Sequence, residues 1–181
     1  MIVQKPSPNF KVGRQGYKPE IIVLHISTGS LASCISWFQN PASQVSAHYI
    51  VGLDGSVVQF VKDEDTSWAQ GKVSAPTFKL YKQGVNPNAY CLSIENEGQD
   101  LSRAPEAQLN ALVGLIASLG AKWNIPLDRN HIIGHYEINS ATRPNCPATD
   151  KSIIDKIVAR LQPIETIEQK KARIIKLIQE L

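Results

Sequence analysis

The stretch EIIVLHIS, residues 20–27, constrains the fold more than any other part of the sequence. Its aliphatic side chains are almost continuous, which is typical of a strand whose two faces are both covered. Such a strand needs other elements packed on each side of its sheet, so the stretch predicts an α/β domain. His25 interrupts the apolar run near its end, and open α/β sheets place their ligands at that end of a strand.

The remaining sequence contains the helices and strands that such a sheet requires. Amphipathic spacing predicts helices at about residues 31–40, 105–124 and 150–162. Strands are predicted at about residues 46–61, 91–98 and 131–135. We expect the first of these to be a β-hairpin with its turn at Asp54-Gly55 and the second to be half-buried. Residues 62–90 are predicted to be a long loop in which TSWAQ forms one helical turn.

The length of 181 residues allows one well-filled core. We therefore expect residues 1–162 to form one domain, with a mixed central β-sheet flanked by helices. Residues 163–181 are predicted to form a separate amphipathic helix, because Pro163 interrupts the chain and isoleucines recur at heptad positions after it. A helix this short needs a partner surface, so we expect either a structural cap on the domain or pairing in a homo-oligomer.

Charge and composition argue against several classes of protein. The net charge of +3 comes without a dense basic stripe, so we expect no nucleic-acid partner. No apolar run is long enough for a membrane span or a secretory signal, so we expect no membrane partner and synthesis in the cytoplasm. The three cysteines are an odd number without a C-x-x-C pair, which argues against a disulfide framework.

Three residues, His25, His135 and Cys146, are candidates for a metal site. His135 closes the apolar run HIIGH as His25 closes IIVLH, and Gly134 permits close approach of another ligand. Cys146 lies in the polar loop TRPNCPATD, where a thiol has no role in core packing. Two imidazoles and a thiolate are ligands that zinc favours, and a fourth position would stay open for catalysis. Each residue taken singly is also compatible with an ordinary structural or surface position.

A zinc hydrolase usually needs a general base as well, and the strand at residues 91–98 offers two glutamates. Glu95 and Glu97 are two positions apart, so strand alternation places both on one face. Either could be the base, and both could instead be solvated residues of a strand face. Composition does not choose between these interpretations.

Four segments, in order and spacing, resemble the type-2 N-acetylmuramoyl-L-alanine amidases, a family that includes phage endolysins and peptidoglycan recognition proteins. They are IIVLHIS, QVSAHYIVGLDGSVVQFV, SIENEG and GHYEINSATRPNCP. The resemblance implies a zinc enzyme, with one Zn²⁺ per chain, that cleaves the bond between the lactyl group of N-acetylmuramic acid and L-alanine in bacterial peptidoglycan. It also implies that His25, His135 and Cys146 bind the zinc and that Glu95 is the base.

Some positions depart from the family pattern. Many members carry a lysine two residues before the third ligand, where this chain has Pro144. We take Arg143 as the candidate replacement that holds the scissile carbonyl, with a structural or solvated arginine as the alternative. Some members use a tyrosine where this chain has Ala47, which leaves Glu95 as the clearer base. The candidate substrate contacts are His48, Trp68 and Tyr90. A core position is the alternative for each of these three.

Three functions agree with the resemblance. A phage-type endolysin, made in the cytoplasm and acting on the cell wall after membrane breach, explains the site and the lack of a signal sequence, and such an enzyme is cytolytic and antimicrobial. A cytoplasmic amidase that recycles small muropeptides is the second. A non-catalytic peptidoglycan-binding module is the third, and Cys146 argues against it because non-catalytic recognition members lack a competent third ligand.

Overall fold

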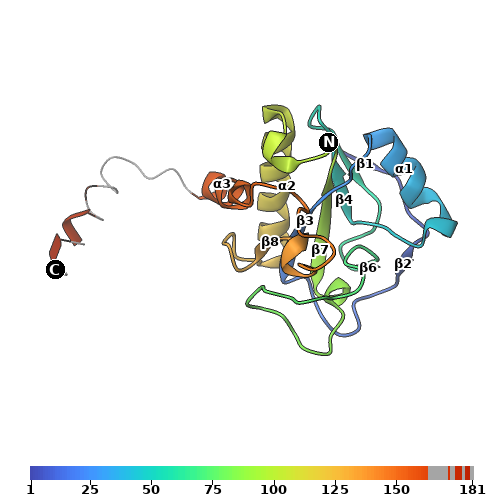
Figure 1. The fold of residues 1–181 in the computed structure, drawn as a ribbon, viewed down its shortest axis with the longest axis horizontal. Coiled ribbons are helices and arrows are strands. Elements are labelled where there is room, and N and C mark those ends of the chain that lie inside the picture. The colour runs from blue at the N-terminus through green and yellow to red at the C-terminus, as the bar shows by residue number, and fades with distance from the viewer. Residues whose placement is uncertain (163–170, 172–173, 177, 180–181) are drawn as a thin grey trace.

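A six-stranded sheet lies at the centre of the computed structural model, which describes residues 1–162, 171, 174–176 and 178–179 (Figure 1). In chain order its strands are β1 (Ile2–Gln4), β3 (Ile21–Ile26), β4 (Tyr49–Val51), β5 (Val57–Gln59), β7 (Cys91–Asn96) and β8 (Ile132–Gly134). Their spatial order is β1-β5-β4-β7-β3-β8. Strands β4 and β5 pair antiparallel, and the other described pairings in this sheet are parallel.

Both faces of this sheet are covered, as the apolar sequence of β3 predicts. Ile22 and Leu24 join a core with α2 (Glu106–Trp123) and α3 (Ser152–Leu161), which lie together on one face (Figure 1). Ile21 and Val23 point to the other face and pack against the segment of residues 73–90. Helix α1 (Leu31–Gln39) covers the β4–β5 part of that second face. The predicted mixed α/β fold, with helices flanking a central sheet, is confirmed.

Several local predictions hold and two are wrong. The hairpin turns at Gly55, whose φ of 85° lies in the left-handed region that glycine tolerates. Strand β7 is not half-buried: it runs between β3 and β4, and Ser93 on its expected solvent face is fully buried. TSWAQ is not a helical turn, because Thr66–Ser67 forms strand β6 and pairs with β2 (Phe10–Lys11).

The predicted helix at residues 163–181 lies mostly outside the described residues. Of its apolar positions, Ile174, Ile175 and Ile178 are described, and each is exposed. Its role as a cap or an oligomerisation element stays a prediction. Among the described residues, no helix has the length and apolar character needed to cross a membrane.

Candidate metal centre

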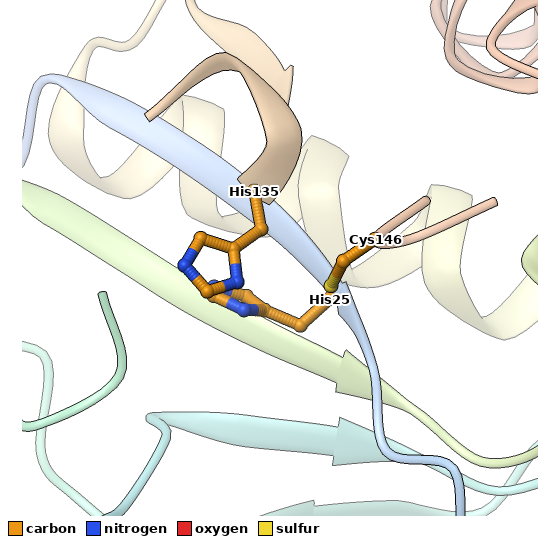
Figure 2. A group of neighbouring side chains, drawn as sticks. All are labelled: His25, His135 and Cys146. Carbon is orange, nitrogen blue, oxygen red and sulfur yellow. The ribbon is translucent and has the colours of Figure 1, made fainter. Parts of the chain in front are cut away.

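His25, His135 and Cys146 converge at the carboxyl ends of the parallel strands (Figure 2). One nitrogen of each ring and the Cys146 Sγ all lie within 4.8 Å of one another. The two imidazole rings are 4.3 Å apart between centroids. His25 belongs to β3, and His135 begins the short 3-10 helix η4 (His135–Glu137) immediately after β8. The three predicted metal ligands therefore form one cluster, although no ion defines their roles.

Sheet register and one glycine bring these residues together. Strands β3 and β8 are adjacent, and Leu24 pairs with Gly134, so His25 and His135 follow neighbouring positions. A Cβ on Gly134 would lie 2.8 Å from Pro147 Cδ, which is too close for a real contact. The absence of a side chain at Gly134 therefore lets the loop that carries Cys146 pack against β8. The backbone N–H of Tyr136 donates to the Cys146 carbonyl at 2.9 Å and fixes that packing.

The electrostatics of the cluster favour neutral imidazoles. Burial lowers the pKa of His25 well below its usual value, and the neighbouring His135 and Arg143 add to this. Burial also lowers the pKa of His135 to about 4. His25 Nε2 is buried and has no hydrogen-bond partner among the described residues. A neutral, unpartnered ring nitrogen in such a place is a free ligand, which a metal ion would satisfy.

The Cys146 thiol lies among groups that can stabilise its thiolate. Burial raises its pKa to about 12 in the metal-free protein, with the negative charge of Glu95 adding to the effect. The backbone N–H of Ile26 donates to Sγ at 3.4 Å, and the positive charges of Arg143 and Lys151 also favour the thiolate. Lys151 in addition donates to the carbonyls of Pro144 and Ala148, so it holds the cysteine loop on both sides. Sequence reasoning missed this lysine, because only the folded loop brings its two acceptors together.

The structure distinguishes the surroundings of Glu95 from those of Glu97, which the sequence could not do. Glu95 is aligned with His25 across β3 and β7, its Oε1 is 4.0 Å from His25 Nδ1, and its Oε2 is buried without a partner. Burial raises the pKa of Glu95 to about 8, although Arg143 opposes this. Glu97 lies beyond the end of β7 and accepts backbone hydrogen bonds from Leu31 at 2.7 Å and Leu53 at 2.8 Å. Glu95 thus faces the cluster, whereas Glu97 joins α1 to the hairpin.

An open cleft of about 580 Å³ runs across the cluster. Arg143 lines one part of it with Thr142, Pro144 and Asn145. Its role in holding a substrate carbonyl stays a prediction. Trp68 lines the cleft and is 37% exposed, so it is free to contact a substrate. Trp37 also lines it and is 55% exposed. Trp37 was not among the predicted substrate contacts, because the sequence of α1 does not reveal that the outer face of this helix borders a cleft.

Two predicted substrate contacts are wrong. His48 is fully buried and does not line the cleft; its Nδ1 accepts a hydrogen bond from Ser93 N at 3.0 Å, and its Nε2 lies 2.7 Å from an Arg14 nitrogen. Tyr90 is also fully buried, because it packs in the apolar cluster beneath β3 and its hydroxyl accepts from the backbone N–H of Lys82. The core alternative is correct for both residues.

The mixed sheet, the His-His-Cys cluster at the ends of its strands and the buried acid beside that cluster are compatible with a hydrolase that uses a bound metal ion. The family described as N-acetylmuramoyl-L-alanine amidase matches residues 15–149, and the chain belongs to it. The predicted family is confirmed, and the predicted enzyme class is the one that the family's description names.

Individual proteins show the same similarity. N-acetylmuramoyl-L-alanine amidase A of Achromobacter lyticus is 29% identical over 126 residues, which cover 68% of this chain and 63% of that protein. The chain thus spans less than two thirds of that relative. The 1,6-anhydro-N-acetylmuramyl-L-alanine amidase AmpD of Citrobacter freundii is 25% identical over 151 residues, covering 74% of this chain and 76% of that protein.

Solved structures agree on the fold. A crystal structure of an AmpD derivative superposes with a TM-score of 0.69 at 22% identity, covering 86% of this chain and 93% of that one. A mutant endolysin from Bacillus subtilis superposes with a TM-score of 0.64 at 22% identity, covering 90% of this chain and 99% of that one. At this level of identity the similarity establishes the fold.

Proposed function

We propose that this chain is a zinc-dependent amidase that hydrolyses the bond between N-acetylmuramic acid and L-alanine in polymeric peptidoglycan, in the manner of a phage-type endolysin. The observation that carries the proposal is the convergence of His25, His135 and Cys146 within 4.8 Å, with the buried Glu95 beside them. Family membership supplies the bond that such a site would act on.

The donor set suits zinc. Two neutral imidazoles and one thiolate are common zinc ligands, and three protein ligands leave a position for substrate or water, as in catalytic zinc sites. The unpartnered His25 Nε2 leaves a ring nitrogen free for a metal ion, and the N–H of Ile26 favours the thiolate form of Cys146 that binds one. Bound there, zinc would polarise the amide carbonyl and lower the pKa of water toward ~7.

Three residues of the chain have proposed roles in the reaction besides the metal ligands. We assign Glu95 as the group that accepts a proton from the attacking water and returns it to the amine of L-alanine as that bond breaks. Its burial and raised pKa suit a group that takes and gives a proton near neutral pH. We assign Arg143 to the oxygen of the scissile carbonyl, where its positive charge stabilises the negative charge that develops on that oxygen. Trp68 offers an apolar surface to the substrate at the same cleft.

Chelation of purified protein, followed by incubation with cell walls, tests the proposal. Release of muramic lactyl ends and L-alanine amino termini should stop on metal removal and return with stoichiometric zinc. Cys146→Ala should lose zinc, measured by elemental analysis, while a Cys34→Ala control at the cleft wall should keep it. Full activity in protein shown to be metal-free would refute the zinc mechanism, and binding to walls without bond cleavage would favour a recognition module.

A second candidate is a cytoplasmic amidase that acts on small 1,6-anhydro muropeptides. The observation in its favour is the similarity to the AmpD relatives over 74% of this chain. Comparing turnover of insoluble walls with turnover of soluble anhydro-muropeptides separates the two. We expect faster cleavage of walls, because the cleft is open and bordered by exposed tryptophans that can contact a long chain.

We further propose that the enzyme acts on the wall after membrane breach, and that residues 163–181 act apart from catalysis, as a cap or an oligomerisation element. The amphipathic pattern of that segment supports the second statement. Release of cytoplasmic content before the onset of wall lysis in a producing cell would support the first.

A further inference from the structure

Gln70 is a fully buried amide in the middle of a loop, and the proposed chemistry gives it no task. Its neighbours Ala69 and Gly71 are partly or fully exposed, so the loop as a whole lies at the surface. Burying a polar side chain there costs free energy unless its hydrogen bonds repay the loss. The hydrogen bonds of Gln70 therefore indicate why this side chain is buried.

Three hydrogen bonds hold Gln70 between the His-His-Cys cluster and the sheet. Its backbone carbonyl accepts from His135 Nε2 at 3.1 Å. Its backbone N–H donates to Asn88 Oδ1 at 3.0 Å, and its side-chain Nε2 donates to Ser93 Oγ at 2.8 Å. Asn88 Oδ1 also accepts from Ala69 N at 3.2 Å, so one amide oxygen fixes two consecutive residues of the loop.

The first of these bonds determines which nitrogen of His135 carries the proton. A carbonyl oxygen only accepts, so Nε2 must be protonated and Nδ1 must carry the lone pair. In Figure 2 the two ring nitrogens of His135 point in different directions, and the one beside the ring's attachment carbon lies on the side of His25 and Cys146. The carbonyl of Gln70 thus selects the tautomer that presents a lone pair to the cluster.

The third bond relates this ring to the proposed base. Ser93 lies on β7 two positions before Glu95, on the same face of the strand. Gln70 therefore connects the His135 ring to the strand that carries Glu95. Because Ser93 is itself fully buried, this connection is shielded from water.

We propose that Gln70 is a positioning residue: its carbonyl sets the tautomer of His135, and its amide holds that carbonyl in place through Ser93. This inference rests on the proposed zinc site. Its measurable consequences are a fixed tautomer in the metal-free protein and a tighter zinc site in the loaded one.

The first experiment needs no metal. Long-range ¹H–¹⁵N correlation spectra of the metal-free wild type should show His135 as the Nε2–H tautomer, and Gln70→Leu should give a mixture of tautomers. A wild-type ring protonated on Nδ1 overturns the inference at once. An unchanged Nε2–H signal in Gln70→Leu overturns the role of the side chain.

The second experiment measures zinc affinity by competition with a chromophoric chelator. Loss of such a supporting contact typically weakens metal binding about 10–100-fold. We expect this for Gln70→Leu and for the milder Ser93→Ala, and we expect the double variant to be no weaker than the worse single one. If Gln70→Leu does not fold, Ser93→Ala and its spectrum decide the question.

Gln108 offers a matched control. It is also a fully buried glutamine with an unpartnered Oε1, and its Nε2 donates to the carbonyls of Val51 and Glu97, away from the cluster. Gln108→Leu should lower stability but change the zinc dissociation constant less than twofold. Equal weakening in both glutamine variants would show a general loss of packing and overturn the inference. Failure of the wild type to bind zinc would instead refute the proposed function.

Discussion

Glu95 and Glu97 lie two positions apart, and exchanging each for glutamine should produce opposite defects. Glu97 accepts two backbone hydrogen bonds, one from Leu31 at the N-terminus of α1 and one from Leu53 in the hairpin. A glutamine keeps one acceptor oxygen and turns a donor toward the other N–H. The retained oxygen can keep the half-buried bond from Leu31, while the exposed N–H of Leu53 loses a charge-assisted bond and binds water instead, which costs about 1 kcal/mol. For a domain of this size that loss lowers Tm by roughly 2–4 °C.

Glu95→Gln should leave stability nearly unchanged at pH 7, because burial raises the pKa of Glu95 to about 8 and the amide replaces a side chain that is mostly uncharged at that pH. Loss of a general base typically costs ~10²–10⁴ in rate. We therefore expect Glu95→Gln to retain zinc and lose turnover by that factor, and Glu97→Gln to keep most of its turnover below its Tm. Thermal unfolding, zinc content and wall hydrolysis of both variants test this. A Glu97→Gln protein that is as stable as wild type but inactive would refute our assignment of the two glutamates.

Four further predictions follow from individual residues. Arg143→Ala should lower kcat by ~10²–10³ with zinc intact, as loss of one oxyanion donor does, and near-normal kcat would exclude this role. Trp68→Ala should raise KM on walls more than it lowers kcat. Burial alone would raise the pKa of Asp63, but hydrogen bonds, led by that from Lys122, outweigh it and lower the pKa. The stability that Asp63 adds over Asp63→Asn should therefore be full above pH ~4 and disappear as the pH falls through the lowered pKa, as urea unfolding at pH 7 and 3 would measure. Deleting residues 163–181 should leave zinc content unchanged while stability or solution mass changes; loss of zinc from a folded truncation would contradict this.

The sequence predicted the parts of the fold that depend on local pattern. Strand β3 was predictable because consecutive apolar residues require cover on both faces, and Gly55 marked the hairpin turn. The clustering of His25, His135 and Cys146 was predictable, because each ends a strand or occupies a polar loop without a packing role. The half-buried prediction for β7 failed because Ser93 is buried by polar partners, which an apolar–polar pattern does not reveal.

Contacts between distant segments were beyond the sequence. Nothing local distinguishes Glu95 from Glu97, because the difference lies in Leu31 and Leu53 reaching only the second. Tyr90 was wrongly predicted as a substrate contact, and Trp37 was not predicted as one, for a similar reason. A tyrosine in a loop-rich region proved to be core, and a tryptophan on a helix proved to border the cleft, because exposure depends on which elements pack above each ring.

The hydrogen bond from Ile26 N–H to the Cys146 sulfur joins positions 120 residues apart. Zinc held by His25 and Cys146 would close the same long loop, which contains most of the sheet and two of the helices. In an unfolded chain these ligands meet rarely, since closing a long loop costs conformational entropy. Metal capture should therefore come late in folding, after β3 and β8 have paired. Free zinc at 100 times its dissociation constant would then add about 2.7 kcal/mol to the free energy of unfolding. In excess chelator this contribution is lost, so the protein should be cleaved faster by a protease.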